Sequence, residues 1–194
     1  HEGESVMTYN VMAINPGHNG SVALVCDGKL EYYIEEERLS RSKYDGNPYR
    51  GMIYLIDRYK IDELIICGTG QEEHRLPWTG EISYGALVRK YYPDVKIKAV
   101  WNEHHFGHAA ASFYGSGFET AAAVIVDGSG SRQSLQVGEK ERDKVEAYET
   151  ESIFKCKGTE IETIFKRHAE NNAPNISSPQ GEIDSTVTTV TAAA

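Results

Sequence analysis

The sequence has few cysteines and no long apolar run, and both shortages exclude classes of protein. Its 194 residues include three cysteines, Cys26, Cys67 and Cys156, which form no CxxC pair and no zinc-ribbon spacing. A disulfide framework is therefore not expected, and we interpret the cysteines as small hydrophobic side chains in a reducing cytoplasm. No apolar run approaches the ~18–20 residues that a membrane-spanning helix needs.

The sequence also has fewer basic than acidic residues. The chain has 20 Lys and Arg against 29 Asp and Glu, a net charge of −9 and a pI near 5.3. A net acidic surface argues against broad binding to a nucleic-acid backbone. Apolar residues make up 40% of the chain and charged residues 25%, so a folded core is expected. The length fits one domain or half of a larger one.

Hydrophobic patterning predicts three antiparallel strands followed by alternating helices and strands. A turn over residues 15–20 ends the first apolar run, and Asp27-Gly28 is a strong signal for a two-residue hairpin. We predict strands at 10–14, 21–26, 29–34, 64–67, 95–101 and 121–126, helices at 49–59, 80–92 and 103–114, and a further hairpin from 134–138 and 145–154.

This order predicts an α/β fold with a mixed sheet and helices. An antiparallel start followed by parallel βαβ units is the layout of a ribonuclease-H-like first lobe of an actin-like ATPase fold. We expect residues 1–6 to be a cloning remnant before a natural start at Met7, and residues 7–170 to form this lobe. Residues 171–194 are expected to form a loop and the start of a helix that the sequence cuts short.

Three histidines in five residues form the sharpest candidate site. His104 and His108 are four apart in the predicted helix, so both imidazoles lie on one face. Asp127 follows a predicted buried strand, where parallel sheets carry site residues. Two imidazoles and a carboxylate suit Fe(II), and also Zn(II) or Mn(II). The alternative is a helix start whose histidines only cap or pair.

Two glycine-rich segments are candidates for binding anions. The turn at 17–21 holds His18, which could serve as acid, base or phosphate ligand, and Asn19, which adds a donor. The segment 127–131 could wrap phosphates as a hairpin loop. Each is equally compatible with a simple turn. Lys43 ends a charged run that composition alone assigns to a solvated face.

Taken together, the motifs carry a family resemblance. The matching segments are Gly17-His18-Asn19-Gly20-Ser21, Asp27-Gly28-Lys29, Glu35-Glu36-Glu37-Arg38-Leu39-Ser40-Arg41, His104-His105-x-x-His108-Ala109-Ala110 and Val126-Asp127-Gly128. In their order and spacing, the chain resembles the amino-terminal part of the O-carbamoyltransferases that modify nodulation factors and aminoglycosides such as tobramycin. That part belongs to a domain like the tRNA threonylcarbamoyl-transfer proteins, with the actin-like fold.

The resemblance implies carbamoyl transfer to a hydroxyl group of a small-molecule acceptor at an iron site. A separate domain would make carbamoyl-adenylate from carbamoyl phosphate and ATP. The matched metal ligands are His104, His108 and Asp127, and the matched general base is His18. The residues matched with binding of the nucleotide intermediate are Lys43, Asn19, Gly128, Ser129 and Gly130.

The sequence departs from the family in two ways. Asn19 stands where the family commonly has Asp, and the segment 127–131 is richer in serine than usual. The family's fourth metal ligand, an Asp of the second lobe, and its adenylate-forming domain are expected beyond these residues, so this stretch alone should be inactive. Two alternatives stay open: threonylcarbamoyl transfer to tRNA, and a non-catalytic actin-like lobe that binds nucleotide or a partner protein.

Overall fold

The computed structural model describes residues 8–17, 19–68, 81–100, 103–128, 130–136 and 144–170. It divides the chain into two compact units, residues 1–103 and 104–194. The lobe over residues 7–170 stays a prediction. We describe each unit by itself. Among the described residues, no helix is both long and apolar enough to cross a membrane.

The first unit contains the mixed sheet that the sequence predicts. Strand β1 is antiparallel to β2, which is antiparallel to β3, while β4 pairs with β1 and β5 pairs with β4 in parallel. The sheet order is β3-β2-β1-β4-β5. Asp27 and Gly28 have φ values of 48° and 80°, as a tight hairpin turn requires. The strands are β1 (Asn10–Asn15), β2 (Ser21–Cys26), β3 (Lys29–Glu35), β4 (Glu63–Cys67) and β5 (Lys96–Val100).

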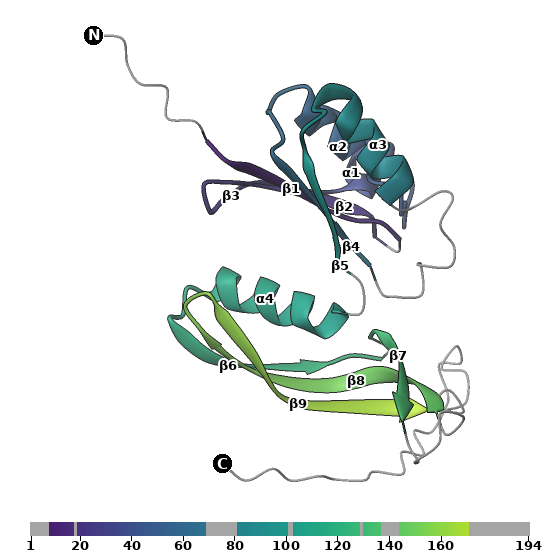
Figure 1. Cartoon of the computed structure of the whole chain (residues 1–194), viewed down its shortest axis with the longest axis vertical. Coiled ribbons are helices and arrows are strands. Elements are labelled where there is room, and N and C mark those ends of the chain that lie inside the picture. The colour runs from purple at the N-terminus through teal and green to yellow at the C-terminus, as the bar shows by residue number, and fades with distance from the viewer. Residues whose placement is uncertain are drawn as a thin grey trace. The chain divides into compact units, whose positions relative to one another are not determined.

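Of the three helices among the described residues of this unit, two agree with the prediction. Helices α2 (Tyr49–Ile56) and α3 (Glu81–Tyr91) lie on the same face of the sheet (Figure 1). Helix α1 (Glu36–Ser40) was missed, because it is little more than one turn inside a charged segment without apolar periodicity. It ends at Arg41, whose φ of 61° is left-handed.

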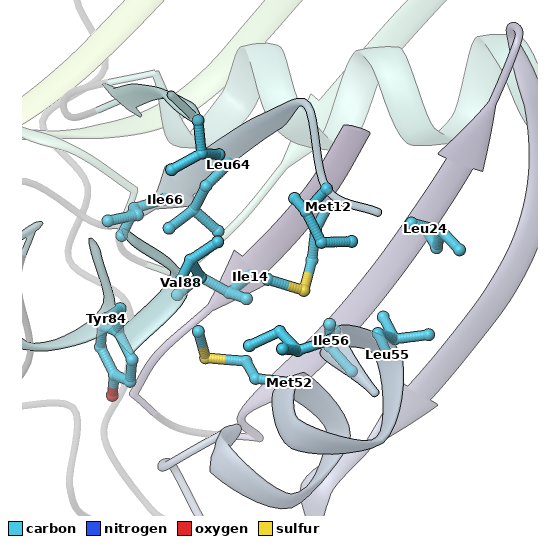
Figure 2. Close-up of a cluster of buried hydrophobic side chains, with 13 residues drawn as sticks. Met12, Ile14, Leu24, Met52, Leu55, Ile56, Leu64, Ile66, Tyr84 and Val88 are labelled. Carbon is cyan, nitrogen blue, oxygen red and sulfur yellow. The ribbon is translucent and has the colours of Figure 1, made fainter. Parts of the chain in front are cut away.

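The core of the first unit lies between the strands and α2. Alternate residues of β1 and β4 are buried, as expected where one face of a sheet is covered. Figure 2 shows their side chains meeting those of α2. Fully buried members include Met12, Ile14, Leu24, Met52, Leu55, Leu64 and Ile66, and helix α3 adds Tyr84 and Val88 to the same cluster. Each large side chain removed from water contributes about 1.5–3 kcal/mol, so this cluster is the main source of the unit's stability.

The second unit is an antiparallel sheet with one helix. Strands β6 (Thr120–Val126), β7 (Arg132–Gln136) and β9 (Glu160–Glu170) all pair with the long strand β8 (Lys144–Lys157). Helix α4 (His104–Ser116) lies along one face of this sheet (Figure 1). Two of its buried side chains, Ala109 and Phe113, share an apolar cluster with Ala123, Phe154 and Cys156.

Two features of this unit differ from the prediction. Strand β6 does not continue the parallel series, since it pairs antiparallel with β8. It is also largely exposed on one side, with Val124 64% and Val126 75% exposed. A run that is apolar at every position does not distinguish the two sheet types. Strand β9 was missed, although Gly158, with a φ of 57°, marks the turn that precedes it.

Asp62 should give the first unit a measurable pH dependence. Its carboxylate accepts hydrogen bonds from the Lys60 ammonium (2.5 Å) and from the backbone N–H of Asn10 (3.0 Å). The hydrogen bond from Lys60, and to a smaller degree the one from the backbone N–H of Asn10, lowers the pKa of Asp62 below its ordinary value of 3.8. When folding lowers the pKa of a carboxyl group, its ionised form stabilises the fold at pH values above the pKa in the unfolded chain. This stabilisation is lost as the pH falls through the pKa in the folded chain.

We therefore expect Asp62→Asn to lower the free energy of unfolding most near neutral pH. The difference from the parent protein should shrink as the pH falls below about 3.8. Urea titrations across this range measure it. The matched control is Asp57→Asn, because the Asp57 side chain is 73% exposed and pairs only with its neighbour Arg58. A difference for Asp62→Asn that stays constant with pH would contradict this account.

Candidate functional site

The three ligand atoms predicted from the sequence converge in the second unit. His104 Nε2 lies 2.7 Å from Asp127 Oδ2 and 3.0 Å from His108 Nε2, and His108 Nε2 lies 3.8 Å from Asp127 Oδ2. The side chains of His104, His108 and Asp127 are 25%, 52% and 32% exposed. We call these three residues the ligand group. They come from one turn of α4 and the end of β6, so the local fold brings them together.

Backbone contacts hold both segments of the ligand group in place. The His104 N–H, in the first turn of α4, donates to Ser131 Oγ at 3.0 Å. The first N–H groups of a helix have no partner within it, so this bond satisfies one of them. The Asp127 N–H donates to the carbonyl of Thr150 on β8 at 2.9 Å, which fixes the residue at the end of β6.

Asp127 is held as an anion. Burial acts to raise the pKa of its carboxyl group, but the His104 hydrogen bond and charge, with smaller help from the Gly128 amide and His108, outweigh burial. The pKa of Asp127 therefore lies below its usual value. An ionised carboxylate and the unprotonated nitrogens of two imidazoles are electron-pair donors of the kind that bind metal ions.

The spacing of the ligand group fits one small divalent ion. Ligands about 2.0–2.2 Å from a metal lie roughly 2.8–3.6 Å from one another at octahedral or tetrahedral angles. The observed separations of 2.7, 3.0 and 3.8 Å bracket this interval. One imidazole nitrogen carries at most one proton, so His104 Nε2 cannot donate to both of its neighbours. A cation would satisfy all three donors at once.

His105 stands apart from the ligand group although it lies within the same motif. Its side chain is fully buried, and Nδ1 lies 2.7 Å from Ser152 Oγ. Nε2 is buried, and no described residue forms a hydrogen bond with it. Burial lowers the pKa of His105, so the ring is neutral at physiological pH. We assign it to the interior of the unit, against β8.

The segment 127–131 is shaped by packing at one glycine. A Cβ on Gly130 would lie 2.7 Å from His105 Nε2 and 2.9 Å from Glu149 Cβ, so only glycine fits there. A Cβ on Gly128 would meet nothing within 4 Å. Ser129 lies outside the described residues. The predicted nucleotide role of these three residues therefore stays a prediction, and Gly130 has a packing reason of its own.

In the first unit the structure joins two segments that the sequence analysis treated separately. The Gly17 N–H donates to the Gly46 carbonyl at 2.9 Å, and the Gly20 N–H to the Asp45 carbonyl at 3.0 Å. The turn that holds Asn19 is thereby tied to the segment that follows Lys43. His18, the predicted base, lies outside the described residues.

Backbone conformation is unusual around these two segments. Asn19 and Tyr44 have φ values of 59° and 61°, a left-handed conformation that non-glycine residues rarely adopt and that is enriched at binding sites. Lys43 is exposed, and its ammonium lies 4.7 Å from the centre of the Tyr44 ring. An exposed cation beside a glycine-rich turn is suited to binding an anion.

Glu36 has a structural role that the sequence did not predict. It belongs to the charged run assigned to a solvated face, yet it is only 1% exposed. Its carboxylate accepts bonds from the N–H groups of Arg50 and Gly51, both at 3.1 Å. Pro48 at the start of α2 provides no side-chain cap, so Glu36 supplies one from a distance. In the sequence, the missing capping side chain at Pro48 is the signal that another residue must accept these N–H groups.

The tie between the two segments gives a direct prediction. A Cβ on Gly46 would lie 2.3 Å from the Gly17 carbonyl oxygen, a backbone atom that cannot rotate away. We expect Gly46→Ala to lower the free energy of unfolding by about 1–3 kcal/mol, the usual effect of overpacking. Gly115→Ala on α4 is the control, since nothing lies within 4 Å of its Cβ position and alanine favours helix. Equal urea midpoints for the two variants would contradict the close backbone contact between Gly17 and Gly46.

Comparison with known proteins finds distant relatives. No family model and no solved structure matches the chain. An uncharacterized protein of Methanocaldococcus jannaschii is 24% identical over 190 residues, which cover 93% of this chain and 35% of that protein. The nodulation protein NolNO of Sinorhizobium fredii is 28% identical over 144 residues, 62% of this chain and 21% of that protein. An uncharacterized protein of Synechocystis is 28% identical over 148 residues, which cover 58% of this chain and 24% of that protein. The chain thus spans about a third or less of the length of these relatives.

Proposed function

We propose that the chain is part of an enzyme that transfers a carbamoyl group to a hydroxyl group of a small-molecule acceptor. The observation that carries this proposal is the convergence of His104, His108 and Asp127 within 4.8 Å of one another. The similarity to a nodulation protein supports it, because the sequence motifs resemble those of transferases that modify nodulation factors. The proposed donor is carbamoyl-adenylate, made elsewhere in the enzyme from carbamoyl phosphate and ATP.

The ligand group is the proposed site of a divalent ion. Two imidazoles and one carboxylate on the same side of a metal are typical of Fe(II) sites that keep open positions. When bound, such an ion supplies Lewis-acid polarisation of a carbonyl or phosphoryl oxygen. The partial exposure of all three side chains leaves room for another molecule to approach them.

The first unit supplies the proposed acid–base and anion-binding residues. In the transfer step, the acceptor hydroxyl oxygen attacks the carbamoyl carbon and a new C–O bond forms. The bond from that carbon to the phosphate oxygen breaks, and AMP leaves with the electron pair. His18 takes the hydroxyl proton in this proposal. Lys43 and the amides of the glycine-rich turn are suited to the phosphate of the leaving group.

Metal content tests the ligand group. We expect the intact protein to bind about one divalent ion per chain, iron when it is loaded without oxygen. Replacing His104 and His108 together by Ala should abolish binding, and His108→Ala alone should weaken it. The His108 side chain is 52% exposed, so its removal should leave the melting temperature nearly unchanged. Elemental analysis after dialysis measures the content.

The matched control for this experiment is Glu103→Gln. Glu103 is an exposed carboxylate directly before His104 and is not part of the ligand group. Its loss should leave metal content unchanged. An unchanged metal content in the His104→Ala, His108→Ala double variant would remove the metal site from the proposal.

Separate half-reactions test His18. In the intact enzyme, His18→Ala should leave adenylate formation unchanged and slow carbamoyl transfer by ~10²–10⁴-fold, the usual effect of losing a general base. Transfer by the parent enzyme should also fall below about pH 6.5, where an unperturbed histidine becomes protonated and can no longer accept a proton. A variant that only melts at a lower temperature, with normal transfer in the cold, would assign His18 to the turn alone.

A further inference from the structure

Ser131 is a junction between the ligand group and β8. It is fully buried, and each of its polar groups has a partner. Its hydroxyl accepts the bond from the His104 N–H, and its carbonyl accepts one from the Glu149 N–H at 3.1 Å. Its own N–H donates to Glu149 Oε2, also at 3.1 Å. Through these hydrogen bonds, Ser131 connects the first turn of α4 to Glu149.

Glu149 is a buried anion that holds this junction from the sheet. It is 0% exposed, and its second carboxylate oxygen accepts a bond from the ammonium of Lys166 on β9. Its carbonyl also accepts the Gly130 N–H at 2.8 Å. Burial acts to raise the pKa of Glu149, but the bond and charge of Lys166 outweigh it and lower the pKa. The carboxylate is thus charged and shared between two donors.

We infer that Glu149, held by Lys166, is a positioning residue for the ligand group. The segment that it anchors begins at Asp127, whose N–H bonds to Thr150 beside Glu149, and ends at Ser131. Both segments that supply ligands are therefore tied to the same two residues of β8. The inference rests on the proposed metal site and adds to it the residues that set the ligand spacing. Outer partners of this kind commonly tune metal affinity.

The two donors that face Glu149 make a sharp variant available. A carboxylate accepts from Ser131 N–H and Lys166 at once, whereas the amide of Gln has one oxygen and one NH₂ group. Glu149→Gln must therefore leave one donor facing another donor. The backbone bonds from the Gly130 N–H to the Glu149 carbonyl and from the Glu149 N–H to the Ser131 carbonyl do not involve this side chain. Adding Lys166→Met removes the conflict, because the Gln oxygen can then turn to Ser131.

The test measures Co²⁺ binding to the full chain by visible absorption, in competition with a chelator, together with the melting temperature without metal. We expect Glu149→Gln to raise the Kd for Co²⁺ by ~10–100-fold. The Glu149→Gln, Lys166→Met double variant should recover most of that loss. The matched control is Glu151→Gln: the Glu151 carboxylate pairs with Arg167 across the same two strands at 3.0 Å, and it bonds to none of the described residues of the 127–131 segment. Its Kd should equal that of the parent.

Each outcome has a distinct meaning. If the parent protein binds no Co²⁺, the proposed metal site fails and the inference fails with it. If the parent binds Co²⁺ and Glu149→Gln binds it equally well, only the inference is overturned, even when the melting temperature falls. Should Glu149→Gln not fold, Ser131→Ala tests the same link, because it removes the acceptor of the His104 N–H. A folded Ser131→Ala with the parent Kd would overturn the inference.

Discussion

The hydrogen bond from the His104 N–H to the Ser131 hydroxyl is the contact on which the ligand group depends, because it joins the two segments that supply ligands. Helix α4 brings two imidazoles one turn apart, but a helix alone does not determine where a carboxylate lies relative to them. The 127–131 segment supplies Asp127 at one end and the bond to α4 at the other. Since that segment is anchored to β8, the sheet sets the distance between the imidazoles and the carboxylate.

Both units use a buried carboxylate to hold backbone N–H groups that would otherwise lack partners. Glu36 accepts from Arg50 and Gly51 at the start of α2, and Glu149 accepts from Ser131 below the ligand group. A buried anion is destabilising without donors, and each of these two has at least two. Truncating either carboxylate would leave buried donors unsatisfied, which is why such residues influence positions that they do not touch.

Much of the fold could be predicted from local sequence signals, and the failures have physical causes. The turn at Asp27-Gly28 and the apolar spacing of α2, α3 and α4 carry their own geometry, so these elements were predicted correctly. Strand β6 was placed in the wrong kind of sheet because pairing partners are set by long-range contacts. The convergence of His104, His108 and Asp127 was foreseen from helical spacing and a strand end. Glu149 was not, because its partner Lys166 lies on β9, which was not predicted.

The origin of the ligand group on one helical turn and one strand end limits what it can do by itself. Donors 2.7–3.8 Å apart could hold one small ion from one side, and such an ion would have other coordination positions available to other molecules. A purely structural metal site is usually closed by four protein ligands, whereas an incomplete set with partly exposed side chains is typical of sites where a substrate binds. In the proposed metal site, the side away from the protein donors would be free for a substrate group. The bonds of Ser131 to His104 and to Glu149 lie on the protein side, so they could hold the donors in position without closing that free side.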